Sequence, residues 1–265
     1  MIQDRPAVGM LLRDWRQRRR MSQLHLACEA EISQKHLSFV ESGRAAPSRD
    51  MVLRLAERLE VPLRAQNQLL VAAGYAPVFP ERSLDDPALR AAREAIDLVL
   101  AGHEPYPALA VDRHWRMVAA NRCVLPLVTG IADPGLLAPP VNVLRLSLHQ
   151  DGLAPRILNL AEWRAHILDR LRRQVELTAD PDLAALLAEL AALPRPPGSP
   201  PSVAPGALVV PLRLRTASGI VLSLLGTTTV FGTPVDVTLA ELALECFYPA
   251  DPATAAALRA MAGAS

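Results

Sequence analysis

Several polar side chains and one aromatic side chain are spaced to share one face of a short helix. They are Gln34, Lys35, Ser38 and Phe39. At about 100° of helix rotation per residue, all four fall within about 140° of one another, and Leu37 points the other way. Amide and ammonium groups match the hydrogen-bonding groups of base edges in the DNA major groove, and an aromatic ring can contact a thymine methyl. The pattern therefore predicts a surface that reads DNA.

Two serines and a glycine define the helices that must carry this face. Ser22 and Ser33 can each accept a hydrogen bond from an orphan amide in the following first turn, and Gly43 can end the second helix. Two short helices joined by a tight turn form a helix-turn-helix. An ordinary helical hairpin with a polar solvent face is the alternative interpretation, because this pattern is weak when taken alone.

Three further helices are expected around this pair, and together they predict an all-α five-helix domain at residues 1–76. The expected helices run from about Val8 to Arg19, from Ser48, and from Pro62 to about Gly74. Residues 1–76 carry 12 basic and 8 acidic side chains, whereas residues 77–265 carry 16 and 19. The positive surplus therefore lies where contact with phosphate is expected.

Three sequence blocks carry a resemblance to a known family. They are LLRDWRQRRRMSQLHLA (residues 11–27), ISQKHLSFVESGR (32–44) and PSRDMVLRLAERLEVP (47–62). With them, residues 9–75 resemble the lambda-repressor-like, Xre-type helix-turn-helix domain, which binds double-stranded operator DNA. The DNA-binding residues that this resemblance implies are Gln23, Ser33, Gln34, Lys35, Ser38, Phe39 and Arg44. Gln23 would bind phosphate and Arg44 would touch the DNA backbone.

The same resemblance implies an ion pair between Arg16 and Glu41, and it draws attention to one departure in the turn. The family usually has a glycine where this chain has Glu31. Either Glu31 adopts a strained conformation with positive φ, or the turn has a different geometry.

Composition describes a globular protein with room for two hydrophobic cores. Of the 265 residues, 51% are apolar and 4% are aromatic. Cys28, Cys123 and Cys246 are odd in number and lie in apolar surroundings, so we interpret them as reduced core thiols. The sequence has no zinc-site spacing, signal-peptide pattern or run of 18 apolar residues. We therefore expect a cytoplasmic protein with no bound metal and no membrane partner.

The rest of the chain is expected to form a linker at residues 77–104, with one helix from about Pro87 to Leu100, and a second domain at residues 105–265. Strands are predicted at Leu109 to Val111, at Met117 to Ala120, and within residues 207–216, 220–232 and 235–249. Helices lie between the second and third strands, and a proline-rich loop is expected at residues 194–206. This layout predicts an α+β domain, with a five-stranded antiparallel sheet, helices on one face and a cavity between them.

Two stretches of this second domain resemble sensor domains. Residues 108–128, ALAVDRHWRMVAANRCVLPLV, resemble the start of a PAS-type domain. Residues 141–171, VNVLRLSLHQDGLAPRILNLAEWRAHILDRL, resemble the ligand-binding domain of MmyB-like transcription regulators. The resemblance implies a PAS-like fold and an apolar or fatty-acid-like ligand. The expected ligand-binding residues are Trp115, Arg145, Leu146, Trp163, His166 and Phe231, with Arg145 as the partner of a carboxylate.

Enzyme motifs are missing from the sequence. None of the six histidines stands in an HExxH spacing or near a nucleophile elbow, and no GxGxxG or GxxxxGK[ST] run occurs. We therefore expect a protein that is not an enzyme and has no cofactor besides a possible bound apolar ligand. A haem or metal sensor, with His149 or His166 as a ligand, is the alternative.

Two hypotheses from different classes follow. The first is a dimeric transcription regulator that binds an operator through residues 9–75 and a small molecule through residues 105–262. The second is a constitutive DNA-binding protein whose second domain serves only for dimerisation or protein interaction. A cavity lined by apolar groups in the second domain would favour the first hypothesis.

Overall fold

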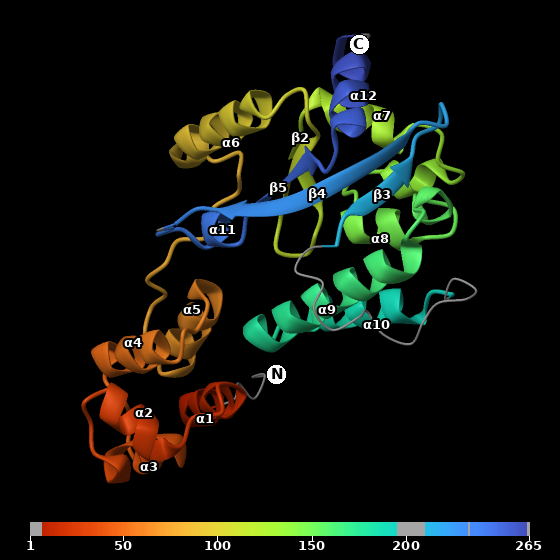
Figure 1. Cartoon of the computed structure of the whole chain (residues 1–265). Coiled ribbons are helices and arrows are strands. Elements are labelled where there is room, and N and C mark those ends of the chain that lie inside the picture. Colours follow the sequence, from red (N-terminus) through yellow and green to blue (C-terminus); the bar gives the residue numbers. More distant parts are fainter. Residues whose placement is uncertain (1–6, 195–209, 233, 264–265) are drawn as a thin grey trace. The chain divides into compact units, whose positions relative to one another are not determined.

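The computed structural model describes residues 7–194, 210–232 and 234–263. The chain divides into two compact units, with the main division between Glu81 and Arg82 (Figure 1). From residue 195 onward the predicted proline-rich loop lies outside the described residues, as do the first three residues of the strand predicted at 207–216.

The first unit consists of short helices joined by tight turns. They are α1 (Val8–Arg18), α2 (Gln23–Glu29), α3 (Gln34–Glu41), α4 (Arg49–Arg58) and α5 (Leu63–Ala72). Ser22, Ser33 and Ser48 are the N-cap residues of α2, α3 and α4, and each side chain accepts a hydrogen bond from the amide three residues later. The all-α helix-turn-helix fold predicted from these caps is confirmed.

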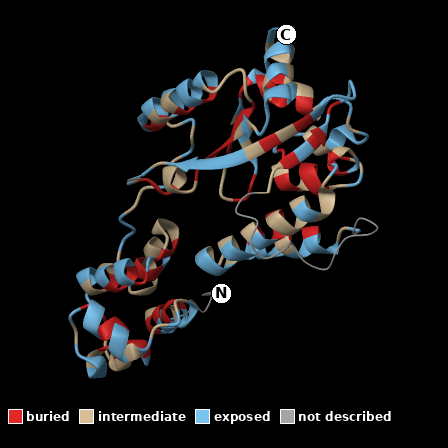
Figure 2. Cartoon of the chain, in the orientation of Figure 1, coloured by how far each residue is buried: buried red, intermediate tan, exposed pale blue. Residues whose placement is uncertain are grey.

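The five helices bury their apolar faces in a common core, and Figure 2 shows buried residues on the sides that face one another. Leu12, Leu26, Leu37, Leu55 and Leu69 are each at most 1% exposed. Helices α1 and α3 approach each other closely at Gly9, where an added Cβ atom would lie 2.2 Å from the carbonyl oxygen of Val40. Glycine is therefore required at this position, because any side chain would force the two backbones apart.

The second unit is built on a five-stranded antiparallel sheet. The strands are β1 (Ala108–Val111), β2 (Met117–Ala120), β3 (Leu212–Arg215), β4 (Val221–Val230) and β5 (Ala243–Pro249), in the order β2-β1-β5-β4-β3. This confirms the predicted α+β fold class. The strand predicted from residue 235 begins later, at Ala243, because Val237–Ala240 form the short helix α11.

The connections between the strands are helical. The α-helices are α6 (Arg90–Gly102), α7 (Leu125–Val128), α8 (Val143–Leu148), α9 (Leu160–Thr178), α10 (Pro181–Ala192) and α12 (Pro252–Gly263). Short 3-10 turns are η1 (Pro87–Leu89), η2 (Arg122–Val124), η3 (Pro134–Leu137) and η4 (Ala154–Arg156). The linker helix predicted from Pro87 to Leu100 therefore corresponds to η1 followed by α6.

Helices cover both faces of the sheet, so the prediction of helices on one face was wrong. Leu109 and Val111 pack in the cluster that includes α8, α9 and α10, whereas Ala108 and Ala110 pack with Ile96 of α6 on the opposite face. Successive side chains of a strand point to opposite faces. Because all four residues of β1 are apolar, both faces there need a cover.

Two of the three cysteines match the prediction of core thiols. Cys123 and Cys246 are buried, and burial raises the pKa of each thiol. Cys28 is exposed instead. It lies on the side of α2 opposite the buried Leu26, where the helix meets solvent.

Candidate functional site

The outward face of α3 carries the residues predicted to read bases. Gln34 and Lys35 are exposed on its first turn. Ser38 and Phe39 follow on the next turn and are half-buried, while Leu37 is fully buried in the core. The helix therefore presents its polar side to solvent and is anchored by its apolar side, as a recognition helix requires.

Phe39 stands between two cations on this face. The Nζ atom of Lys35 lies 5.7 Å from the centroid of the Phe39 ring, and the Cζ atom of Arg44 lies 5.8 Å from it. Such contacts contribute about 0.5 to 1 kcal/mol each at an exposed site. The ring thereby holds two positive side chains beside the face that would meet phosphates and base edges.

The turn before α3 combines a strained residue with a strong cap. Glu31 has a φ of 54°, so of the two alternatives for this position the strained conformation is the one adopted. A non-glycine residue in this region costs about 1 to 3 kcal/mol. Ser33 then accepts a hydrogen bond from the amide of His36 at 3.1 Å and starts the helix.

A network centred on Glu41 joins three helices of the first unit. The Nε and Nη2 atoms of Arg16 donate to the two carboxylate oxygens of Glu41 at 2.6 and 2.8 Å, which confirms the predicted pair. Gln23 also donates to Glu41, from its side-chain nitrogen at 2.8 Å. Burial raises the pKa of Glu41, but these hydrogen bonds outweigh it and hold the pKa below its ordinary value. The amide nitrogen of Gln23, expected on phosphate, is thus already engaged within the protein.

A cavity of about 290 Å³ lies in the second unit between the sheet and helices α8 and α9. Trp115, Leu146, Trp163 and His166, all predicted to bind a ligand, contribute to its wall. Most of the remaining wall is aliphatic and comes from Leu109, Met117, Val124, Leu127, Val128, Leu144, Leu153, Ile167, Leu212 and Leu214. An apolar cavity with a few polar groups is typical of a small-molecule site.

The main polar group in the cavity wall is an ion pair between α9 and β5. Two guanidinium nitrogens of Arg170 donate to the two carboxylate oxygens of Glu245, at 3.0 and 2.6 Å. Thr228 accepts a hydrogen bond from Arg170 at 2.7 Å and donates to Glu245 at 3.1 Å. The guanidinium also stacks over the ring of Trp115, with its Cζ atom 4.4 Å from the centroid. This arrangement holds the guanidinium of Arg170 and the carboxylate of Glu245 in place.

A second polar strip runs along α9 beside this pair. The indole nitrogen of Trp163 donates to Ser147 Oγ at 2.9 Å, and the His166 ring stacks on Trp163 with centroids 5.6 Å apart. Burial, together with the positive charges of Arg170 and Arg173, lowers the pKa of His166. His166 therefore presents a neutral imidazole to the cavity at pH 7.

Comparisons with known families find a match in each unit of the chain. Residues 92–261 match the MmyB-like transcription regulator ligand binding domain, and residues 7–69 match a helix-turn-helix domain. The first match alone spans more than half of the chain. The chain belongs to the MmyB-like transcription regulators. It is a ligand-sensing, DNA-binding regulator, and both matched families are regulator domains rather than enzymes. Among curated proteins, none matches this sequence.

Two residues that were predicted to bind the ligand lie outside the cavity of this MmyB-like regulator. Arg145 pairs at the protein surface with Glu189, through bonds of 2.6 and 2.7 Å, because it lies on the outward side of α8. Phe231 packs against the cluster on the other face of the sheet, which includes Ile96 and Leu100. Successive residues of a strand point to opposite faces of the sheet. Since Gly226 of β4 lines the cavity, the odd-numbered positions that follow it face away from the cavity.

The ion pair of Arg170 and Glu245 was missed in the sequence. Arg170 follows Trp163 and Ile167 at helical spacing, so it continues the stripe of α9 that faces the cavity. Glu245 is a single acidic residue in the otherwise uncharged strand β5. An isolated charge inside a buried strand indicates a partner, but the sequence does not say which residue that partner is.

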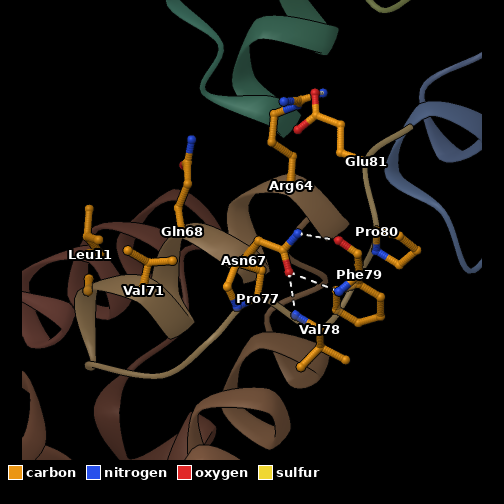
Figure 3. A pocket seen from close by; sticks show the side chains of 11 residues that line it. Leu11, Arg64, Asn67, Gln68, Val71, Pro77, Val78, Phe79, Pro80 and Glu81 are labelled. Atoms are coloured by element: carbon orange, nitrogen blue, oxygen red, sulfur yellow. Dashed lines mark hydrogen bonds and ion pairs between the residues drawn. The ribbon is translucent and has the colours of Figure 1, made fainter. Parts of the chain in front are cut away.

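A separate hollow of about 850 Å³ opens on the first unit, between α5 and the chain that follows it (Figure 3). Asn67 donates to the carbonyl oxygen of Phe79 at 2.7 Å and accepts from the amides of Val78 and Phe79 at 3.0 and 3.1 Å. Arg64 and Glu81 form an ion pair of 2.7 Å at one end. These contacts tie the chain after α5 back to that helix.

One group of side chains in the described ranges has the composition of a metal site. Potential ligand atoms of His114, Asp180 and Asp182 lie within 4.8 Å of one another. Arg113 lies 3.3 Å from the same Asp180 oxygen that faces His114, and Asp180 also accepts bonds from the first amides of α10. The arrangement is thus an ion-pair network at a helix N-terminus.

Within the described ranges, no helix is both long and apolar enough to cross a membrane.

Proposed function

We propose that this MmyB-like regulator senses an apolar or fatty-acid-like molecule in the cavity of its second unit. The observation that carries the proposal is the cavity itself, about 290 Å³ in volume and lined mainly by aliphatic and aromatic side chains. An apolar ligand gains about 25 cal/mol for each Å² of surface that it removes from water. A hydrocarbon chain therefore matches this wall better than a sugar or a nucleotide would.

DNA recognition in this proposal depends on α3. Gln34, Lys35, Ser38 and Phe39 would contact base edges, and Ser33 and Arg44 would lie near the backbone. Gln23 remains in the proposed contact set through the second hydrogen of its side-chain nitrogen, because the first is donated to Glu41. The positive surplus of this part of the chain supports attraction to phosphate.

The regulator would bind its operator as a homodimer. Two copies of α3 must then reach half-sites about 34 Å apart, one turn of DNA. A ligand changes operator affinity only if it binds one arrangement of the dimer better than another. A constitutive DNA-binding protein, with a second domain that only dimerises, is the alternative that the experiment must exclude.

The test begins with native mass spectrometry of freshly purified protein, which reports a bound molecule and the oligomeric state together. The protein is then freed of ligand by mild denaturation and refolding. Its affinity for DNA selected from a random library is measured by fluorescence anisotropy with and without a panel of fatty acids. We expect a copurified apolar molecule and an operator affinity that changes with at least one fatty acid.

A variant that fills the cavity separates ligand binding from other effects. Gly226 lines the cavity, and an added Cβ atom would meet only the Phe247 ring at 3.7 Å, so Gly226→Leu adds bulk where space exists. Val230→Leu, at an exposed position of the same strand, is the matched control. We expect only Gly226→Leu to abolish the response. An unchanged operator affinity across the panel, with no copurified molecule, would leave the dimerisation alternative.

A further inference from the structure

The charges in the cavity wall cancel. Of the described residues that line the cavity, Arg170 is the only one with a permanent positive charge and Glu245 the only one with a negative charge. The Glu245 side chain is 8% exposed and that of Arg170 is 33% exposed. A buried anion without a partner is strongly unfavourable, so a charged ligand would need a cation that is not already neutralised.

Arg170 is not such a cation. Its bonds to Glu245 and Thr228 and its stacking on Trp115 occupy two of its nitrogens and one face of its guanidinium. Both oxygens of Glu245 in turn accept hydrogen bonds within the same group. A ligand carboxylate that approached Arg170 would therefore be repelled by the negative charge of Glu245 at close range. It could bind the guanidinium only if this network of hydrogen bonds were broken.

The groups beside the pair can bind an uncharged polar head. Within the described part of the chain, the ring of His166 forms neither a hydrogen bond nor an ion pair with another residue, and it lines the cavity. The charged groups that act on it are Arg170, Arg173 and Asp169 on its own helix and Glu245 on β5. A neutral imidazole offers one donor and one acceptor, and Ser147, which lines the same cavity, adds a hydroxyl. These groups match a hydroxyl, ester or amide.

The geometry points to a ligand that occupies the cavity with an uncharged head group: a long-chain alcohol, ester or amide, or a fatty acid in its protonated form. This inference rests on the proposed function, because it specifies the head group of a molecule whose chain fills the apolar part. With an uncharged head group, the ligand needs no cation as a partner, which was the role predicted for Arg145. Arg145 pairs instead with Glu189 at the surface.

The test compares decan-1-ol with decanoate, two ligands of equal chain length, by isothermal titration calorimetry on the full ligand-free chain. At pH 8 we expect decan-1-ol to bind at least tenfold more tightly than decanoate. If only the protonated acid binds, decanoate affinity should rise about tenfold for each pH unit as the pH is lowered from 8 to 6. The affinity of decan-1-ol should change little over the same range.

A substitution in the ion pair gives an independent and opposite prediction. Glu245→Gln preserves the shape of the side chain and leaves Arg170 with an unneutralised charge. Decanoate affinity at pH 8 should then rise tenfold or more, while decan-1-ol affinity stays within a factor of two or three. Glu189→Gln removes a carboxylate of similar geometry from the surface pair with Arg145 and should change neither affinity. Circular dichroism before titration verifies that each variant is folded.

The outcomes separate the two proposals. Decanoate that binds the wild-type chain as tightly as decan-1-ol at pH 8, with no dependence on pH, would overturn the uncharged head group and leave an apolar-ligand sensor intact. Unchanged decanoate affinity in folded Glu245→Gln would also overturn the uncharged head group and leave the apolar-ligand sensor intact. Absence of binding by both ligands would overturn the proposed function, and the inference about the head group with it.

Discussion

Arg16 and Glu41 form a bidentate ion pair between α1 and the last turn of α3, with nitrogen to oxygen distances of 2.6 and 2.8 Å. The Glu41 side chain is 3% exposed, and Gln23 of α2 donates to the same carboxylate. One buried carboxylate thus fixes the recognition helix to both helices that precede it. Removing one partner of such a pair is costly, because the other charge stays buried.

Glu41→Ala should therefore destabilise the first unit by about 3 to 5 kcal/mol. Hydrogen-exchange mass spectrometry of the full chain measures this, because it reports opening segment by segment, and the loss of protection should appear in peptides from α1 to α3. Glu57→Ala, at an exposed position of α4, should have little effect. Equal protection in Glu41→Ala and wild type would mean that the pair contributes no net stability.

The same carboxylate should make the first unit sensitive to acid. The pKa of Glu41 in the folded protein lies below its ordinary value of 4.5, so its contribution to stability is complete above that pH and declines as the pH falls through the folded pKa. Urea unfolding at pH 7 and at pH 3.5 should show a larger loss for wild type than for Glu41→Gln. If both proteins lose the same free energy of unfolding, other carboxylates cause the acid sensitivity.

His166 should give the second unit a pH dependence of its own. Its pKa is lowered from an ordinary value of 6.5, so below pH 6.5 the unfolded chain binds a proton that the folded chain does not. The free energy of unfolding should therefore decrease as the pH falls from 7 to 5.5. His166→Gln should remove this part of the slope, measured by urea unfolding of the ligand-free protein. A slope that is the same in both proteins would exclude His166 as its source.

Lys35→Ala tests the proposed base contact. Lys35 is the single lysine in a chain with 27 arginines, and it lies exposed on α3. If it donates to guanine, the substitution should weaken operator binding by about 1 to 3 kcal/mol and weaken binding to random DNA much less. Arg44→Ala, expected at phosphate, should weaken both by similar amounts. Equal losses for Lys35→Ala on both DNAs, measured by fluorescence anisotropy, would assign Lys35 to phosphate too.

The first unit could be predicted in detail because its determinants are local. Serine caps, helical spacing and a terminal glycine define where α2 and α3 begin and end, and each of these signals lies in or beside the helix that it defines. The orientation of Leu37 follows from the helical period. Even the strain at Glu31 was one of two stated alternatives. The pairing of Arg16 with Glu41 is not local, and it came from the family resemblance.

The second unit was harder to predict because distant residues decide its details. Asn121 precedes η2 without capping it; its side chain accepts from the amide of Ala108 and donates to the carbonyl oxygens of Leu100 and Tyr106. The partner of Arg170 lies 75 residues away on another element. Periodicity reveals which side of a helix or strand is buried, but it does not reveal which two buried polar groups meet.

The close contact between α1 and α3 at Gly9 limits the ways in which ligand binding can change the affinity for DNA. Because the backbones of α1 and α3 touch there, and Arg16, about two turns further along α1, binds Glu41, the last turn of α3 is fixed to α1 at two points. This part of the first unit should therefore move as one block. A ligand that switches this regulator is then expected to act by moving or releasing the whole block, and the sequence preference of the helix-turn-helix should stay the same whether the sensor is empty or full.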